Sequence, residues 1–146
     1  MTARMDQIKT HATRTIISVD AMGGDQGPAA VVAGIAHSAQ KNFEIGFIVH
    51  GPRDELERLV AKRRGLQGRC EIRHAPDVVT MDDKPSSVVR HGRDTSMWSA
   101  LESVRNGEAT VCVSCGNTGA LMLMSVIRLR KLPGIYRPAI AVMWPS

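Results

Sequence analysis

The sequence contains few aromatic residues, which make up only 3% of its 146 positions. Few rings are therefore available to stack on nucleic-acid bases, and we expect no nucleic-acid partner. The three cysteines are an odd number without a regular spacing. They indicate free thiols in a reducing compartment and not a disulfide framework, so we expect a cytoplasmic protein.

Long uncharged apolar runs are also absent, which excludes a membrane-spanning helix. The opening segment 1–14 carries charge but no apolar core of a signal peptide, and we expect it to be a disordered tail. Residues 15–146 are expected to form one domain, because 43% hydrophobic residues suffice for a core. The net charge of +5 favours anionic partners without choosing among phosphates, acidic proteins and a membrane surface.

Short apolar runs alternate with segments of helical periodicity along the chain. Strands are expected at 15–20, 43–51, 70–75, 108–114 and 139–144, and helices at 28–41, 53–64, 95–107 and 118–131. Strands that are apolar on both faces are typical of a parallel sheet covered by helices. The fold class is therefore α/β, with an open, mainly parallel sheet in a Rossmann-like three-layer α/β/α arrangement.

The helix expected at 119–129 is apolar nearly all round, which predicts burial on more than one side. The rest of the chain offers too little to bury it. The chain also stops directly after the strand expected at 139–144. We therefore expect either a second copy, as a homodimer, or a further C-terminal portion to pack here. In the second case the chain is an N-terminal fragment of a larger fold and is inactive alone.

The stretch "DAMGGDQGP" joins the first strand to the first helix. Gly23 and Gly24 can adopt positive φ and turn successive N–H groups inward, and Pro28 suits the first position of a helix. Such a nest at a helix start attracts phosphate. The alternative is that the glycines only make a tight turn.

The stretch "VSCGNTGALM" makes a second elbow of the same kind. Gly116 releases the chain from its strand, Asn117 is a good N-cap, and Thr118 and Gly119 carry the first free N–H groups of a helix. The alternative here is capping alone. Two such elbows on neighbouring loops of one sheet favour shared anion binding.

A third stretch, "MDDKPSSVVRHGR", places a cation and a hydroxyl beside another predicted helix start. Pro85 suits the first helical position, with Lys84 and Ser86 on either side and Arg90 further along. The alternative is a solvated charged loop.

Other motifs are excluded by their spacing. No Walker loop or GxGxxG occurs, and the second strand ends in His50-Gly51 without the carboxylate that would hold a ribose, so NAD binding is disfavoured. Cys112 and Cys115 lie three positions apart on a strand, so they point to opposite faces and are expected to be buried thiols. The five histidines show no metal spacing, and we expect no metal site.

Four stretches, "SVDAMGGDQGP", "MDDKPSSVVR", "VSCGNTGALM" and "GIYRPAIAVMWP", resemble the bacterial phosphate acyltransferase family of phospholipid synthesis. The match runs from about Ile16 to the end and covers less than half of a family chain. The resemblance implies transfer of a fatty acyl group from acyl carrier protein to inorganic phosphate, which gives acyl phosphate without a metal or organic cofactor. Cys115, where the family has Ala, and Met143-Trp144 depart from its pattern.

The resemblance also implies roles for the residues of the three stretches. Phosphate attacks the thioester directly, since no covalent nucleophile is evident, and the role of Asp20 stays open. Catalysis is assigned to Lys84, Asn117 and Asp25, although how Asp25 acts is open as well. Binding of phosphate or acyl phosphate is assigned to Gly23, Gly24, Ser86, Arg90, Thr118 and Gly119.

The segment "RLRKLPGIYR" is basic, and acyl carrier proteins are acidic, so we expect it to dock the carrier. The docking residues would be Arg128, Arg130, Lys131 and Arg137, with a solvated helix end as the alternative. Peripheral contact with the membrane and with the downstream acylphosphate:glycerol-3-phosphate acyltransferase is also expected. Two other functions stay open: a phosphotransacylase that uses acyl-coenzyme A, and a non-catalytic module that binds acyl carrier protein or lipid.

Overall fold

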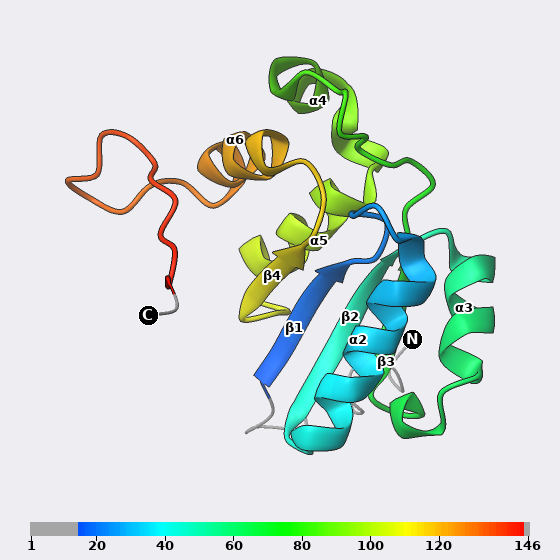
Figure 1. Cartoon of the computed structure of the whole chain (residues 1–146). Coiled ribbons are helices and arrows are strands. Elements are labelled where there is room, and N and C mark those ends of the chain that lie inside the picture. The colour runs from blue at the N-terminus through cyan, green and yellow to red at the C-terminus, as the bar shows by residue number, and fades with distance from the viewer. Residues whose placement is uncertain (1–14, 145–146) are drawn as a thin grey trace, which may run out of the picture.

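The computed structural model describes residues 15–144, so the tail expected at 1–14 lies outside the described residues. Within these residues, four strands form one sheet in the order β3-β2-β1-β4, and every neighbouring pair is parallel (Figure 1). The strands are β1 (Thr15–Asp20), β2 (Ile45–Gly51), β3 (Cys70–His74) and β4 (Val111–Ser114). The predicted parallel sheet is confirmed.

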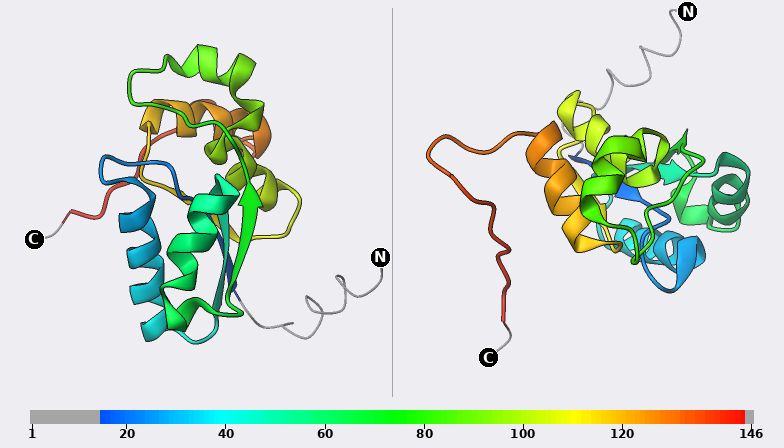
Figure 2. Two further views of the ribbon diagram at one scale, coloured as in Figure 1. Left: turned by 90° about the vertical axis from the view of Figure 1, so that its right-hand side faces the viewer. Right: turned by 90° about the horizontal axis from the view of Figure 1, so that it is seen from above.

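Within residues 15–144, α2 (Gly27–Lys41) and α3 (Arg53–Ala61) cover one face of this sheet, and α5 (Ser96–Arg105) covers the other (Figure 2). On that second side α6 (Thr118–Arg128) packs on α5, and α4 (Pro85–His91) packs on α6 beyond the end of the strands (Figure 1). Two short 3-10 helices, η1 (Arg64–Leu66) and η2 (Gly92–Asp94), complete the connections. The predicted three-layer α/β/α arrangement is therefore confirmed.

Each face of the sheet has its own apolar cluster. On the α2 side, Val32 and Ala39 pack with Val19 and Val49 of the central strands, and all four are buried. On the other side, the fully buried side chains of Met97 and Met124 bring α5 and α6 together. Burying a side chain of this size contributes about 1.5 to 3 kcal/mol, so the two clusters fix the helices to the sheet.

The strand predicted at 139–144 is wrong. Residues 130–144 form no helix or strand, and the side chains of Ile140, Val142, Met143 and Trp144 are exposed. A strand exists only through hydrogen bonds to a neighbour, and β4, at the edge of the sheet, pairs only with β1 among the described strands. The apolar residues of 139–144 therefore have the composition of a strand without the pairing.

The apolar helix α6 is only partly covered. Ala120 and Met124 are buried, whereas Met122, Ile127 and Leu129 just after the helix are 38%, 47% and 39% exposed. The expected burial on more than one side is not achieved within the described residues. Among these residues no helix is both long and apolar enough to span a bilayer.

The strand order creates a crevice at one point of the sheet. The chain first adds β2 and β3 on one side of β1 and then returns to place β4 on the other side. The loop after β1 enters α2 on one face, and the loop after β4 enters α6 on the opposite face (Figures 1 and 2). In open α/β sheets, ligands bind in the crevice at such a reversal of strand order.

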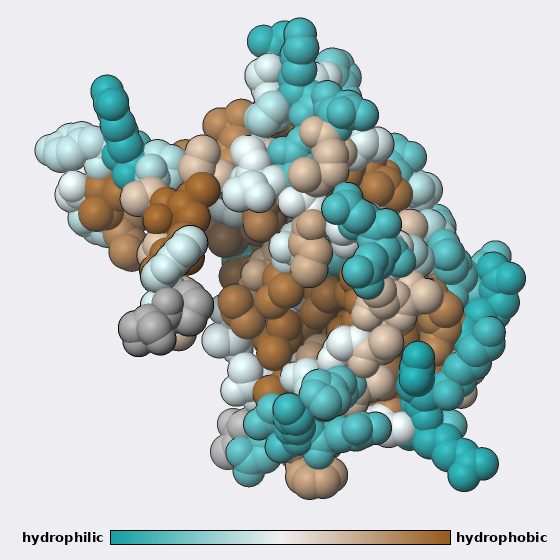
Figure 3. Space-filling model, in the orientation of Figure 1, coloured by the Kyte–Doolittle hydropathy of each residue, from teal (hydrophilic) through white to brown (hydrophobic). Residues whose placement is uncertain are grey.

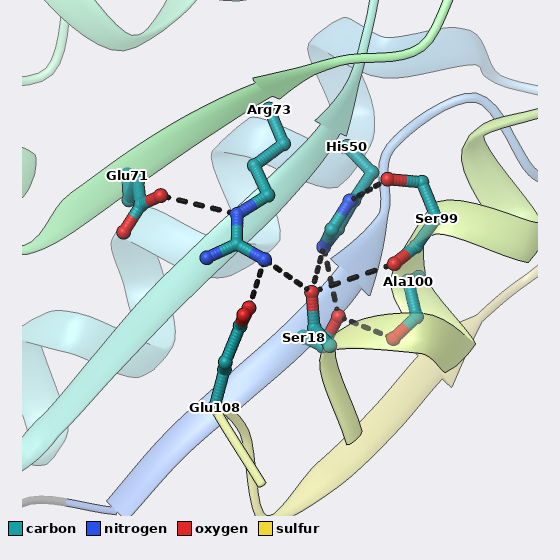
Figure 4. Close-up of polar contacts among 8 residues, drawn as sticks. Ser18, His50, Glu71, Arg73, Ser99, Ala100 and Glu108 are labelled. Atoms are coloured by element: carbon teal, nitrogen blue, oxygen red, sulfur yellow. Dashed lines mark hydrogen bonds and ion pairs between the residues drawn. The ribbon is translucent and has the colours of Figure 1, made fainter. Parts of the chain in front are cut away.

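A buried polar network joins α5 to the sheet below this crevice (Figure 4). Ser18 Oγ donates to the carbonyl oxygen of Ala100 at 2.8 Å and lies 2.9 Å from His50 Nε2. Because its one hydrogen is used in this way, Ser18 accepts from a protonated Nε2. Nδ1 then accepts from Ser99 Oγ at 2.8 Å, which fixes His50 as the neutral Nε2–H tautomer.

The network reaches the surface through Arg73 on β3. Its guanidinium donates to Ser103 Oγ at 3.0 Å and pairs with Glu71 and Glu108. His50 is fully buried and loses its hydration when charged. Burial, together with the positive charge of Arg73, lowers the pKa of His50 from 6.5 to about 3.

We predict that acid destabilises the fold through His50. Between pH 6.5 and about 3 the unfolded histidine binds a proton and the folded one does not, so stability falls as pH falls. This one group contributes a slope of up to about 1.4 kcal/mol per pH unit. His50→Asn should lower stability at pH 7, and its deficit relative to the wild type should shrink toward pH 4 in urea unfolding.

The exposed His37 on α2 provides the matched control. His37→Asn should leave both the stability at pH 7 and its pH dependence close to those of the wild type. A constant difference between wild type and His50→Asn from pH 7 to pH 4 would contradict the neutral buried histidine.

Candidate functional site

A buried carboxylate lies under the crevice. Asp20, the last residue of β1, is 2% exposed and stands in register with Ser114, the last residue of β4. Ser114 Oγ donates to Asp20 Oδ2 at 2.7 Å and accepts from the N–H of Gly116 at 3.1 Å. Asp20 Oδ1 accepts from the N–H of Met22 at 3.1 Å. The pair therefore anchors both loops, which we call the paired elbows (residues 21–27 and 115–119).

The paired elbows touch each other through glycine. A Cβ added to Gly23 would lie 2.7 Å from the backbone nitrogen of Gly116 and 2.9 Å from Ser114 Oγ. Gly24 has φ +102°, and a Cβ there would lie 3.2 Å from that of Cys115. The first position requires the absence of a side chain, and the second requires a conformation that L-residues rarely adopt. The sequence prediction of positive φ is confirmed for Gly24 and is wrong for Gly23, which needs glycine for the close approach alone.

Both elbows end at helix starts. Asn117 is the N-cap of α6, as the sequence predicted. The first position of α2 is taken by Gly27, so Pro28, predicted there, lies one residue further into the first turn. Asn117 Oδ1 accepts from the N–H of Ala120 at 3.0 Å. The N–H groups of Thr118 and Gly119 make no hydrogen bond within the described part of the chain. Such free first-turn donors, at the positive end of a helix dipole, favour an anion.

The third predicted stretch meets the second elbow. Asn117 Nδ2 lies within hydrogen-bond distance of the carbonyl oxygens of Thr80, Met81 and Asp83, at 3.1, 3.3 and 3.0 Å. A Cβ on Gly119 would lie 3.1 Å from Cγ of Pro85, so the start of α4 rests on the start of α6. Asn117 thus holds the loop before α4 with its amide while its oxygen caps α6.

The charged residues of the predicted site are exposed. Lys84 is the N-cap of α4, Ser86 follows Pro85, and Arg90 lies in the last turn, farther from the elbow. Lys84 and Arg90 form no ion pair with any described residue. Asp25 is exposed on the first elbow. The structure therefore brings Lys84 to the elbows through its neighbour Pro85, but not Arg90.

The residues predicted to dock a carrier protein fall into two groups. Arg128 pairs with Glu102 and stacks on the Trp98 ring at 4.7 Å, and its hydrogen bond lowers the pKa of Glu102. Arg130, Lys131 and Arg137 lie in the exposed segment after α6. Lys131 Nζ donates to the carbonyl oxygen of Tyr136 at 2.8 Å.

The three cysteines are free, but the expectation of buried thiols is wrong for Cys115, which is exposed. Cys112 packs on the α5–α6 side and Cys115 beside α2, so their predicted opposite directions are confirmed. Burial raises the pKa of Cys70 to about 11 and that of Cys112 to about 12, which makes both thiols inert near neutral pH. The exposure of Cys115 follows from its position past the end of β4, on the open side of the sheet.

The sequence did not reveal the pairing of Asp20 with Ser114. Both residues end a predicted strand, which was the available signal. Their contact depends on β4 lying next to β1, and the sequence pattern does not fix that strand order. Among residues 15–144, no group of three or more His, Cys, Asp or Glu is arranged to hold a metal ion.

Comparison with known proteins gives a consistent set of relatives. A family model described as fatty acid synthesis protein matches residues 15–146. The phosphate acyltransferase of Ruegeria sp. (strain TM1040) is 68% identical over 146 residues, which is 100% of this chain and 39% of that protein. The phosphate acyltransferase of Paracoccus denitrificans (strain Pd 1222) is 72% identical over 131 residues, 90% of this chain and 35% of that protein.

A third relative, the phosphate acyltransferase of Cereibacter sphaeroides (strain ATCC 17025 / ATH 2.4.3), is 70% identical over 137 residues, 94% of this chain and 37% of that protein. The chain thus spans 39% or less of the length of these three relatives. The paired elbows lie inside the part that all three share with it.

We predict that Gly23→Ala forces the paired elbows apart. Its methyl group would meet the backbone of Gly116, which cannot move without breaking the hydrogen bond to Ser114. Overpacking of this kind costs about 1 to 3 kcal/mol of unfolding free energy, measured in urea. The control is Gly65→Ala, where an added Cβ has no atom within 4 Å. Equal stability of the two variants would show that the elbows are not tightly packed.

Proposed function

The chain belongs to the family described as fatty acid synthesis protein, and from that premise we propose that it supplies the phosphate-binding part of an acyltransferase. The enzyme would transfer a fatty acyl group from acyl carrier protein to inorganic phosphate, for phospholipid synthesis. The observation that carries this proposal is the close approach of Gly23 to Gly116, which sets the starts of α2 and α6 beside one crevice. The start of α6 has free N–H groups at Thr118 and Gly119, and a helix start of this kind favours an anion.

The chemistry requires an oriented phosphate and donors for the charge that develops on the acyl oxygen. A phosphate oxygen attacks the thioester carbonyl carbon, a C–O bond forms, and the C–S bond breaks. The sulfur leaves as the carrier's thiol and takes up the proton that phosphate loses. The N–H groups of Thr118 and Gly119 would hold the phosphate, and such preorganised donors require no reorganisation during reaction.

The side chains around the elbows would have the remaining roles in the proposed reaction. Lys84, exposed and without an ion pair among the described residues, would add positive charge to the crevice. Asn117 would position the other groups of the site, because its amide nitrogen holds the loop before α4 and its oxygen caps the start of α6. Ser86 would provide a hydroxyl. Asp25 would be compatible with a bound phosphate only if its carboxylate shared a proton with the phosphate, because the two negative charges otherwise repel each other.

Two other functions predict different results in a thioester assay. A phosphotransacylase that uses acyl-coenzyme A has the same chemistry, and thioester loss with each donor separates the two. A non-catalytic module that binds acyl carrier protein or lipid predicts no phosphate-dependent loss of thioester from either donor. The phosphate acyltransferase names of the relatives favour the enzyme.

We predict that Lys84→Glu weakens phosphate binding at least tenfold and leaves unfolding in urea nearly unchanged. Reversing one exposed charge near a bound dianion removes an attraction and adds a repulsion, whereas an exposed side chain contributes little to the fold. Isothermal titration with inorganic phosphate measures the first effect. The control is Lys62→Glu at the end of α3, an equally exposed lysine. Equal losses in the two variants would place the phosphate elsewhere.

We also propose that the segment after α6 docks the acidic carrier through Arg130 and Arg137. Replacing both with Ser should slow association with acyl carrier protein and flatten its salt dependence, because exposed charges act mainly on the association rate. Arg128→Ser should instead reduce stability, since Arg128 is paired with Glu102. Stopped-flow association at several salt concentrations would measure this, and an unchanged rate in the double variant would exclude this docking site.

A further inference from the structure

The loops around the crevice carry more negative than positive charge, although the chain as a whole has a net charge of +5. These loops are residues 20–27, 80–84 and 115–119. They contain one basic residue, Lys84, and four aspartates, Asp20, Asp25, Asp82 and Asp83. Figure 3 shows the hydrophilic surface at this end of the molecule, over α4 and the start of α2. An anion that enters the crevice therefore meets several carboxylates and a single ammonium group.

Two of these carboxylates already accept hydrogen bonds from the protein. Asp20 uses both oxygens, which accept from Ser114 Oγ at 2.7 Å and from the N–H of Met22 at 3.1 Å. Asp83 Oδ2 accepts from the N–H of Thr80 at 2.7 Å. Neither aspartate forms an ion pair with a described residue. Asp20 is also 2% exposed, so it adds negative charge below the crevice and cannot contact a ligand.

Asp25 is a carboxylate of the first elbow that is free to contact a ligand. It is exposed, and its side chain makes no hydrogen bond or ion pair among residues 15–144. It follows Gly24, where an added Cβ would lie 3.2 Å from that of Cys115, and Asp25 and Cys115 line the same hollow beside the elbows. The free N–H of Thr118 comes three positions after Cys115. The Asp25 carboxylate and the free donors of α6 therefore border one crevice.

Phosphate and sulfate differ at such a site by a proton. The two tetrahedral anions are nearly equal in size, and hydrogen phosphate and sulfate have the same charge, so the N–H groups of a helix start hold both alike. Near neutral pH phosphate keeps a hydroxyl, which donates a hydrogen bond to a carboxylate, whereas every oxygen of sulfate is an acceptor. A carboxylate beside the anion therefore attracts phosphate and repels sulfate.

We propose that Asp25 makes the crevice select phosphate over sulfate, by accepting a hydrogen bond from the hydroxyl of the bound phosphate. This inference rests on the proposed function, in which the crevice binds inorganic phosphate. The N–H groups of Thr118 and Gly119 hold the oxygens that carry no proton, and Lys84 offsets only part of the negative charge of the loops. The proton stays on the phosphate. An anion without a hydroxyl meets the same carboxylate as a repulsive charge, so Asp25 is a specificity-determining residue.

The test is isothermal titration of the protein with phosphate and with sulfate, at one pH near neutrality and one ionic strength. We expect phosphate to bind at least about tenfold more tightly, because one charge-assisted hydrogen bond takes the place of a repulsion. Asp25→Asn should bring the two affinities to within about threefold of each other, mainly because sulfate binds more tightly. Its unfolding in urea should stay close to that of the wild type, since the side chain is exposed and makes no contact that the fold requires.

Two further variants separate the hydrogen bond from a general effect of charge. Asp82→Asn removes an exposed carboxylate from the loop before α4. It should raise the affinity for both anions by a similar factor and leave their ratio unchanged, because hydrogen phosphate and sulfate have the same charge. Asp25→Glu keeps the carboxylate, and phosphate should remain the preferred anion.

Three other results would overturn the inference in different ways. Equal affinity of the wild type for both anions would show that Asp25 does not select, while the phosphate site stands. If neither anion binds, the proposed phosphate site fails and the inference fails with it. If Asp82→Asn abolishes the preference and Asp25→Asn does not, another carboxylate accepts the hydroxyl and the assignment to Asp25 is wrong.

Discussion

The hydrogen bond between Ser114 Oγ and the buried carboxylate of Asp20 is the contact on which the crevice depends. Parallel pairing of β1 and β4 puts these two residues at the same level of the sheet. Without the bond, two loops that leave neighbouring strands toward opposite faces would diverge. When the bond is made, Ser114 Oγ also accepts a hydrogen bond from the N–H of Gly116, and Gly23 lies against that nitrogen. This one side-chain pair therefore holds the two loops together at the point where the strand order reverses.

A second buried polar cluster serves the other half of the sheet. Ser18, His50 and Ser99 satisfy one another and tie β1 and β2 to α5, with each donor matched to an acceptor. Such a cluster stabilises only when it is fully satisfied, so it allows one tautomer and one helix position. Because α5 also packs on α6 through Met97 and Met124, this constraint reaches the second elbow. The two clusters together hold the first-turn donors of α6 at a fixed place.

The sequence predicted the parts of this structure that depend on local chemistry. Pro28, Pro85 and Asn117 mark helix starts, because their preferences depend on their own backbone. Strand order, by contrast, arises from long-range pairing, so the contact of Asp20 with Ser114 could not be found from the sequence. The failure at 139–144 has the same origin, since an apolar segment becomes a strand only when an edge is available to pair with it. The roles of the predicted site residues remain predictions.

The start of α2 is fixed to the first elbow by its backbone. Gly27 donates its N–H to the carbonyl oxygen of Gly24 at 3.4 Å, and Pro28, the second residue of the helix, carries no N–H. The first-turn N–H groups of Thr118 and Gly119 in α6, by contrast, make no hydrogen bond among the described residues. Since backbone groups and the absence of side chains at Gly23 and Gly116 create this arrangement, it depends on the fold of the chain more than on any single reactive residue.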